Sequence, residues 1–395
     1  MSPAQHPVHE TRDGVRDGVK GLETPRDGVP ETVSPRRCQR TRNTGVERER
    51  DSAWTGEPTG FRIFSRSCGW PEGCIDLADG KEGEGMGWPL RMFQEEGYYF
   101  VTSRCFQGRL LLRPSAEVNE VVGGVLARAL QQSAGNVRLH AFTFASNHFH
   151  LLVWAQGAAL ASFMQYLRAN LSKKVGRLVD WSGGFWERRY SAEPVLDDTA
   201  LVGRLRYVLA HGVKEGLVER SAEWPGLTCL PQLLGPARRL FRWFNWTKRW
   251  SKRGKEDMRA ADGRFAEEIA EPVELEVAPL PCWEGLGEEG RQRAVVGLVE
   301  QVEAEARAQG KPVLGVRAVK AQHPHTRPER LKRSPRPLGH ASTRQALKEW
   351  REQYRDFVAA FREAAARWTR GDFSASFPLY SFPPRVMPVR VARGV

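Results

Sequence analysis

Two histidines separated by one residue are the part of this 395-residue sequence best suited to chemistry. His148 and His150 lie in the stretch Asn-His-Phe-His-Leu-Leu at 147–152. In a β-strand, side chains at i and i+2 share a face, so the two imidazoles would project together, about 7 Å apart at Cα. Two imidazoles at that spacing can ligate one divalent cation. The pattern also fits two surface histidines on a half-buried strand, and by itself it does not decide between these readings.

A tyrosine and a third histidine share one face of a predicted helix over 199–215. On a helical wheel, the apolar residues form a stripe that we expect to be buried: Leu201, Val202, Leu205, Val208 and Leu209. Tyr207 and His211 lie on the opposite face and are four residues apart, so they are neighbours there. The wheel therefore argues against a core tyrosine and leaves a solvent-exposed or a reactive one.

A phenol beside metal-bound imidazoles suits one reaction in particular. A tyrosine hydroxyl can attack a DNA phosphodiester while a divalent cation polarises a non-bridging oxygen. The free phenol has a pKa of about 10, so it needs activation or a strongly polarised phosphorus. The product is a covalent phosphotyrosine, which conserves the energy of the broken bond for rejoining.

The scaffold for these residues is predicted between residues 92 and 230. Patterns typical of strands and of amphipathic helices alternate there. The strands are expected at 98–105, 137–145, 148–154 and 185–195, and the helices at 118–130, 160–178 and 199–215. Ser146-Asn147 is a turn signal, so 137–154 is expected to be a hairpin. This order favours an α+β domain with an antiparallel sheet faced by helices.

Four segments of this region carry a family resemblance, in the family's order. They are Tyr-Phe-Val-Thr-Ser-Arg at 99–104, Ser-Asn-His-Phe-His-Leu-Leu at 146–152, Phe-Trp-Glu-Arg-Arg-Tyr at 185–190, and the stretch 205–218, after which Trp224-Pro225 follows. Together they resemble the REP-associated tyrosine transposases, the single-tyrosine branch of the HUH (His-hydrophobic-His) endonucleases. The resemblance covers about a third of the chain and implies a ferredoxin- or RRM-like HUH nuclease fold.

The resemblance also implies roles for individual residues. His148 and His150 match the metal-binding pair, and Tyr207 matches the nucleophile. The family's further ligand, usually an amide residue one turn after the tyrosine, corresponds to His211, with Gly212 where many members have proline. Imidazole also ligates metals, so His211 is expected as the third ligand. Members cut single-stranded or hairpin DNA with Mg²⁺ or Mn²⁺, holding a 5′-phosphotyrosine and releasing a 3′-hydroxyl, and they occur as monomers and as dimers.

Composition agrees with a polyanionic partner. The chain has 60 Lys and Arg against 47 Asp and Glu, a formal charge of +13 and a pI of about 9.7, which favours nucleic acid ahead of an anionic membrane. No apolar stretch approaches the roughly 18 residues of a membrane helix. The first 14 residues lack the apolar region of a secretory signal. The six cysteines are too sparse for a disulfide scaffold, so a cytoplasmic location is expected.

Composition shifts along the chain predict three regions. Residues 1–90 repeat Arg-Asp-Gly-Val three times and are expected to be mostly disordered. Residues 91–235 would form the catalytic domain. Residues 236–395, with helices expected at 289–309 and 343–369, would form a basic, mostly helical accessory region that binds DNA.

Basic and aromatic side chains outside the catalytic constellation suggest DNA contacts. Lys173, Lys174, Arg188 and Arg189 are candidates for backbone phosphates. The run 238–255 holds eight Lys and Arg and no acid, interleaved with aromatic rings, and suits single-strand binding. Its candidates are Arg242, Trp246, Lys248 and Arg249. Equally, that run could be an amphipathic helix packing a tryptophan stripe on the catalytic domain, and the basic stretch 311–340 could be a DNA contact or a linker.

Two other functions fit the same residues. One is a catalytically silent, basic DNA-binding protein on the same fold, such as a regulator of repeat elements. The other is a metal-dependent phosphodiesterase in which water replaces Tyr207 as the nucleophile. The DNA sequence recognised and the cleavage position are not encoded in these patterns.

Overall fold

The computed structural model describes residues 89–251, 267–329 and 337–385, with the side chains of 249–251 left out. The contacts divide the chain into residues 1–72 and 73–395, and all described residues belong to the second unit. The low-complexity region at 1–90 therefore falls almost entirely outside the described residues, and its predicted disorder stays a prediction. The proposed domain boundary at residue 235 lies within the described residues and also stays a prediction.

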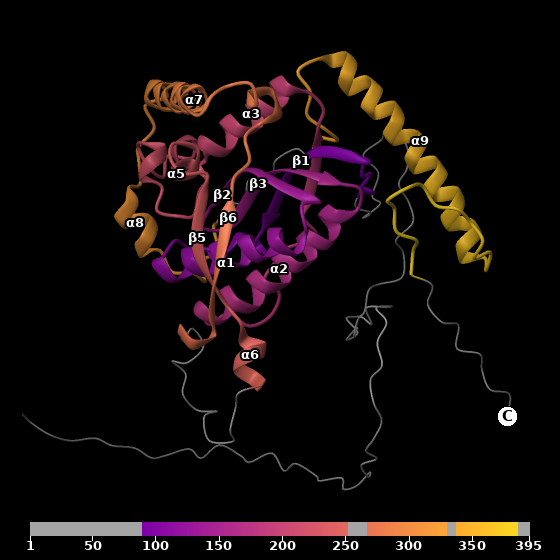
Figure 1. The fold of residues 1–395 in the computed structure, drawn as a ribbon, viewed down its shortest axis with the longest axis horizontal. Helices are drawn as coiled ribbons and strands as arrows, with labels where there is room; N and C mark the ends of the chain where they lie inside the picture. Colours follow the sequence, from indigo (N-terminus) through magenta and orange to yellow (C-terminus); the bar gives the residue numbers. More distant parts are fainter. Residues whose placement is uncertain (1–88, 252–266, 330–336, 386–395) are drawn as a thin grey trace, which may run out of the picture. The chain divides into compact units, whose positions relative to one another are not determined.

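A four-stranded antiparallel sheet forms the centre of the described unit (Figure 1). Its strands are β1 (Glu96–Arg104), β2 (Val137–Phe144), β3 (His148–Gln156) and β4 (Ser191–Val195), in the order β2-β3-β1-β4. The predicted α+β class with an antiparallel sheet faced by helices is confirmed. Strand β4 is shorter than expected, because 185–190 is irregular; this segment meets the end of β1 through the Cys105–Trp186 bridge and a hydrogen bond from the Glu187 amide to the Arg104 carbonyl at 3.0 Å.

Helices cover both faces of this sheet. Helices α1 (Ala116–Gln132) and α2 (Ala159–Leu178) lie on one face, and α3 (Asp198–Leu209) lies on the other (Figure 1). Phe149 and Leu151 of β3 are fully buried in the core. Because side chains alternate along a strand, His148 and His150 project from the opposite face.

The helix predicted over 199–215 is broken into two. Asp197 caps α3, its carboxylate accepting a hydrogen bond from the Ala200 amide at 2.8 Å, as a helix start requires. The chain then leaves the regular helix at Ala210 and resumes as the single turn α4 (His211–Lys214). His211 therefore begins a new turn instead of continuing the helix of Tyr207.

The basic-aromatic run at 238–255 begins as a strand, so the amphipathic-helix interpretation is wrong for its first half. Strand β5 (Arg238–Phe244) pairs antiparallel with β6 (Ala270–Glu276), and only the short α6 (Trp246–Ser251) follows β5. Phe241 and Trp243 are buried at alternate positions, as the period of two in a strand requires. Their rings pack inside the protein and are not available for stacking on bases.

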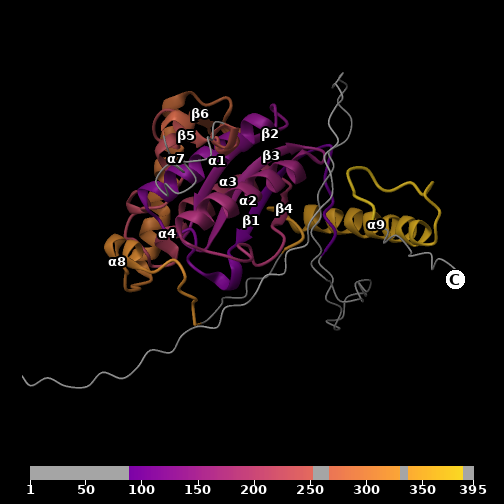
Figure 2. The ribbon, with the colours of Figure 1, turned by 90° about the horizontal axis from the view of Figure 1, so that it is seen from below.

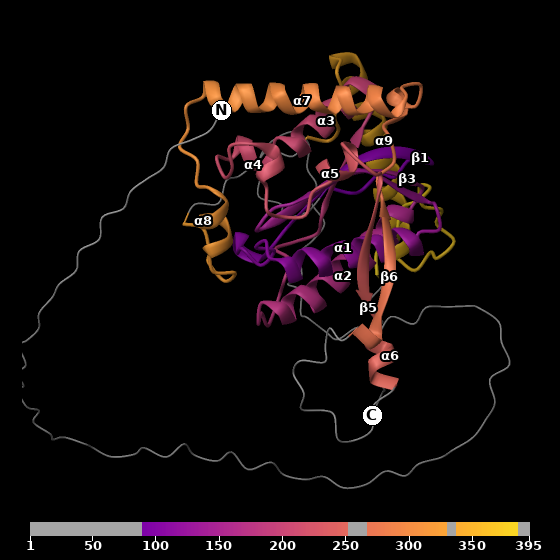
Figure 3. The ribbon, with the colours of Figure 1, turned by 60° about the vertical axis from the view of Figure 1, so that its left-hand side comes forward.

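This hairpin contacts α1 at a pair of glycines (Figure 3). A Cβ added to Gly124 would lie 2.2 Å from the carbonyl oxygen of Arg242, and one added to Gly123 would meet the Phe241 ring at the same distance. Glycine inside a helix costs about 1 kcal/mol relative to alanine. Glycine is needed at both positions because β5 approaches α1 too closely to leave room for a Cβ atom.

Gly124→Ala is expected to lower the free energy of unfolding by about 1–3 kcal/mol, because the new methyl group overlaps backbone that cannot rotate away. Chemical denaturation measures the change. Gly297→Ala is the matched control: it lies in a helix with nothing within 4 Å of the added Cβ, so it should raise stability by about 0.5–1 kcal/mol. Equal effects of the two substitutions would contradict the contact between the hairpin and α1.

The remaining described elements are mostly helical. They are α5 (Leu230–Leu233), α7 (Glu288–Ala308), α8 (Val316–Ala321) and α9 (Arg344–Thr369), with short 3-10 turns at Phe106–Gly108, Ser221–Glu223, Glu267–Ile269 and Pro281–Trp283. Helix α7 contacts α3 and α4 (Figure 3). Ahead of α9, His340 forms an isolated parallel bridge with Val195 of β4. Helix α9 lies on the β4 side of the sheet (Figure 2). None of the described helices is both long and apolar enough to cross a membrane.

Candidate active site

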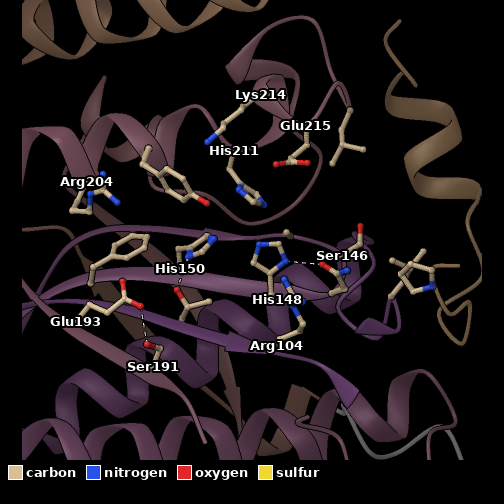
Figure 4. Close-up of a pocket in the computed structure, with 18 of the residues that line it drawn as sticks. Arg104, Ser146, His148, His150, Ser191, Glu193, Arg204, His211, Lys214 and Glu215 are labelled. Carbon is tan, nitrogen blue, oxygen red and sulfur yellow. Dashed lines mark hydrogen bonds between the residues drawn. The ribbon is translucent and has the colours of Figure 1, made fainter. Parts of the chain in front are cut away.

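Three imidazoles from separate segments meet in a pocket between the sheet and the α3–α4 segment (Figure 4). His148 and His150 come from β3, and His211 faces them from the first position of α4. One ring nitrogen of each lies within 4.8 Å of those of the other two. The ring centroids are 4.6–5.1 Å apart. The pocket has a volume of about 680 Å³ and is large enough for a nucleotide phosphate and its sugar.

Hydrogen bonds orient two of the rings for ligation. The Nδ1 of His148 lies 2.6 Å from the Asn147 side-chain oxygen, an acceptor, so this nitrogen donates and Nε2 keeps its lone pair. The Nδ1 of His150 lies 2.9 Å from the Thr102 hydroxyl. The Nε2 of His150 is buried and has no hydrogen-bond partner among the described residues. A buried nitrogen without a partner, beside two more imidazoles, fits a metal ion.

The electrostatics of the pocket keep the two β3 rings, His148 and His150, neutral. Burial lowers the pKa of His148 well below its usual value, and the neighbouring His211 and Arg104 lower it further. Burial likewise lowers the pKa of His150, with His148 and His211 adding to the effect. Neutral imidazole is the form that binds a metal, so the burial that disfavours the charged form prepares the rings to act as ligands.

Tyr207 reaches the same pocket from α3. Its ring centroid is 5.3 Å from that of His150 and 6.4 Å from that of His211. Phe100 of β1 contacts both His150 and Tyr207: its ring stacks on that of His150 at 5.1 Å and meets that of Tyr207 edge-on at 5.6 Å. Tyr207 is half-buried, so part of its side chain is exposed to the pocket. Helix α3 is covered by β2 and β3 on one side and by α7 on another, so its polar face borders the pocket.

Two cations flank the Tyr207 ring. The Arg204 guanidinium carbon is 5.4 Å and the Lys214 Nζ 4.7 Å from the ring centroid. Burial raises the pKa of the Tyr207 phenol, Glu215 adds to the rise, and Arg204 opposes it. The phenol is therefore protonated at neutral pH, and a nucleophilic role needs its proton to be removed. Neither cation was predicted from the sequence, although Arg204 lies three residues before Tyr207 and so on the same face of α3. Lys214 comes from α4, beyond the break at Ala210, and only the tertiary structure brings it to the ring.

The rim of the pocket is also rich in positive charge. Arg104, Arg188 and Arg189 line it, and the last two are among the predicted phosphate contacts. Glu193 and His340 form a pair at 2.8 Å at the β4 edge. Sequence reasoning missed this pair, because its members are 147 positions apart and meet only through the bridge beyond β4.

Lys174 contradicts its predicted role as a phosphate contact. Its side chain is buried, it donates a hydrogen bond to the Phe244 carbonyl, and its Nζ lies 3.9 Å from the Trp243 ring centroid and 4.4 Å from that of Trp246. The lysine covers the apolar end of the β5–β6 hairpin with its long stem. Lys174 is therefore a packing residue that ties α2 to the hairpin.

The other predicted DNA contacts lie outside this pocket. Arg242 is exposed and forms ion pairs with Glu120 and Glu267, and its DNA contact stays a prediction. Trp246 is half-buried against Lys174 and Arg177, so its ring is not a free stacking platform. Lys173 and Lys248 are exposed, and their DNA contacts stay predictions. The side chain of Arg249 lies outside the described residues.

The buried Lys174 gives a pH dependence with a definite sign. Burial lowers its pKa from 10.5 to about 8, so between these values the unfolded chain binds more protons than the folded one. Stability from this group should therefore rise as pH increases from 8 to 10.5, by about 1–3 kcal/mol. Chemical denaturation at several pH values should show this rise in the difference between the wild type and Lys174→Met. A constant difference across the window would contradict it.

Comparisons with known proteins find only distant structural similarity. No family model matches the chain, and no curated protein matches it. A solved structure of a REP-associated tyrosine transposase bound to a REP hairpin is similar, with a TM-score of 0.32 and 15% identity over 36% of this chain and 82% of that one. A putative transposase from Deinococcus radiodurans R1 has a TM-score of 0.23 and 16% identity over 33% of this chain and 95% of that one. The case for a function therefore rests on the pocket itself.

Proposed function

We propose that this protein is a DNA transposase or single-strand DNA endonuclease that cuts and rejoins DNA through Tyr207. The observation that carries the proposal is the convergence of three imidazoles, two of them buried, and one phenol ring in a single pocket with a basic rim. The family resemblance of the sequence segments at 99–104, 146–152, 185–190 and 205–218 supports it. A homodimer and a cytoplasmic location stay predictions.

The proposed reaction starts with attack of the Tyr207 hydroxyl oxygen on the phosphorus of a DNA phosphodiester. The oxygen–phosphorus bond forms as the bond from phosphorus to the 3′ oxygen breaks. The phenol loses its proton, and the departing 3′ oxygen gains one and leaves as a hydroxyl. The 5′ end stays attached as phosphotyrosine, a polarity that follows from the resemblance.

The residues around Tyr207 have roles that follow from their charge. Arg204 and Lys214 stabilise the phenolate as the proton leaves, because each holds a positive charge close to the ring. Arg104 and Arg188 on the rim attract the phosphates of the DNA backbone. Phe100 keeps the ring of Tyr207 close to His150.

His148, His150 and His211 would hold the divalent cation, and the unpartnered Nε2 of His150 is the observation that the residues fit one. When bound, the cation polarises a non-bridging phosphate oxygen. Of the two expected ions, Mn²⁺ suits this set better than Mg²⁺, because the three donors are nitrogens and Mg²⁺ prefers oxygen. DNA attachment is accordingly expected to be faster with Mn²⁺.

A labelled single-stranded hairpin, incubated with the protein and Mn²⁺ or Mg²⁺ and run on a denaturing gel, tests the proposal. A protein-linked DNA band that disappears with EDTA is the expected result. Free nicked DNA without a protein-linked band would identify a phosphodiesterase that uses water. Intact DNA with a shift on a native gel would identify a DNA-binding protein without catalysis.

The catalytically silent DNA-binding protein is favoured by one specific observation. Burial raises the pKa of the Tyr207 phenol, which makes the nucleophile harder to ionise. Arg204 opposes this rise in pKa, and Lys214 places a second positive charge beside the ring, where it can stabilise a phenolate. We therefore place the transposase or endonuclease first.

A further inference from the structure

Three arginines gather around Tyr190, directly before β4. The guanidinium carbon of Arg91 lies 3.6 Å from the Tyr190 ring centroid, and that of Arg168 on α2 lies 5.9 Å from it. Arg189 is the chain neighbour of Tyr190, and its charge acts on the tyrosine. Arg91, Arg168, Arg189 and Tyr190 are called the arginine cluster below.

The arginine cluster holds its positive charges against neutral groups. Arg91 donates to the Tyr190 carbonyl at 2.7 Å, Arg168 to the Arg188 carbonyl at 2.6 Å, and Arg189 to the Pro89 carbonyl at 2.7 Å. Among the described residues, no salt bridge joins any of these three to a carboxylate. Carbonyls orient a guanidinium but leave its charge uncancelled.

Burial makes this arrangement costly for the protein without a ligand. Burial lowers the pKa of Arg168 to about 10, and the charge of Arg91 lowers it further. Burial also lowers the pKa of Arg91, and the charge of Arg189 adds to this decrease. Like charges that are partly removed from water repel one another until an anion neutralises them.

Two polar atoms in the arginine cluster have no partner of their own. Tyr190 is only 7% exposed, and its hydroxyl has no hydrogen-bond partner among the described residues. The Nε of Arg168 is buried and unpartnered in the same way. Buried donors are usually paired, so the unpartnered Tyr190 hydroxyl, beside three cations that have no carboxylate partner, fits an acceptor that carries negative charge.

The arginine cluster adjoins the pocket of Tyr207. Arg189 belongs to the cluster and also lines the pocket, as do Arg188 and Ser191 on either side. Arg168 comes from α2, on the face of the sheet opposite α3, so the cluster and the pocket lie on the two sides of the sheet near β4, and Arg189 is the member of the cluster that also borders the pocket.

We propose that the arginine cluster is a second phosphate site, which holds a backbone phosphodiester of the same DNA strand beyond the Tyr207 pocket, where the strand passes Arg189 and the start of β4. Guanidinium forks match phosphate oxygens in pairs, and the tyrosine hydroxyl adds a neutral donor. The DNA source of the phosphate rests on the proposed function, whereas the affinity for a phosphate group does not.

The first test compares single-stranded DNA binding by wild type and Arg168→Gln over a range of salt concentrations, by fluorescence anisotropy. Loss of one phosphate contact should weaken binding about 3- to 10-fold and make the slope of log affinity against log salt shallower by about 0.7. Arg351→Gln is the matched control, because it removes one exposed charge from α9 and should leave both quantities unchanged. Equal behaviour of the two variants would overturn the proposal.

The second test replaces DNA with inorganic phosphate and follows thermal unfolding at constant ionic strength. Phosphate should raise the Tm of wild type and of Arg351→Gln above the value in chloride, and it should raise that of Arg168→Gln much less. In chloride, Arg168→Gln should unfold no earlier than wild type, since removing one cation relieves the repulsion. A purely structural arginine predicts the opposite, a fall in Tm.

The two tests separate this site from the proposed function. Wild type that binds no DNA, yet gains stability from phosphate through Arg168, would refute the proposed function and leave a site for free phosphate. A DNA effect alone supports the proposal, because a phosphodiester in a strand is held by its neighbours as well. No effect of Arg168→Gln in either test would refute the phosphate site, whatever happens at Tyr207.

Discussion

Tyr207→Phe is expected to abolish covalent attachment of DNA while DNA binding persists. The substitution removes one oxygen and keeps the ring, so the edge-on contact with Phe100 and the neighbouring cations remain. Because that oxygen would form the bond to phosphorus, attachment should fall by about 10³-fold or more. A denaturing gel with labelled hairpin DNA measures the adduct, and a native gel measures binding.

Tyr166→Phe provides the matched control. Tyr166 lies on α2, half-buried and 6.1 Å from the Trp243 ring centroid, and it does not line the pocket. Its hydroxyl should be dispensable, so adduct formation should match the wild type. An adduct that survives in Tyr207→Phe would exclude Tyr207 as the nucleophile.

Replacing His148 and His150 together by alanine is expected to remove metal-dependent cleavage and to leave the fold intact. Both rings line the pocket, on the face of β3 opposite the fully buried Phe149 and Leu151. With one imidazole left, the site should lose its affinity for the cation, and cleavage should fall by about 10²-fold or more. EDTA should have the same effect on the wild type.

A binding measurement separates loss of the metal from loss of structure. Mn²⁺ at 100 times its dissociation constant should stabilise the wild type by about 2.7 kcal/mol, and the double variant should show no such gain. His323→Ala is the control, because His323 is exposed and outside the pocket, and it should keep both the gain and the cleavage. Cleavage by the wild type that continues undiminished in EDTA would contradict the metal role.

Local patterns predicted most of the central scaffold. The alternation in 137–154 predicted the β2–β3 hairpin, and the wheel over 199–209 predicted which residues of α3 are buried, with Val202 only half-buried. These features depend on neighbours a few positions away, so the chain itself encodes them. The strand at 238–244 was missed, because its alternation is hidden by a density of aromatic and basic residues that fits a helix as well.

Sequence spacing alone determined that His148 and His150 share a face, because the period of a strand is two, and that Tyr207 lies away from the apolar stripe of its helix. Only the tertiary structure decided that His211, Tyr207 and Phe100 meet them, since this depends on α3 crossing the sheet and on the break at Ala210. It also decided which cations are available: Lys174 is buried under tryptophans and Arg242 is paired with glutamates, whereas Arg204 and Lys214 reach the phenol. The sequence determines which residues are charged, but the partners and the burial of each charge depend on the packing of segments that are distant in the sequence.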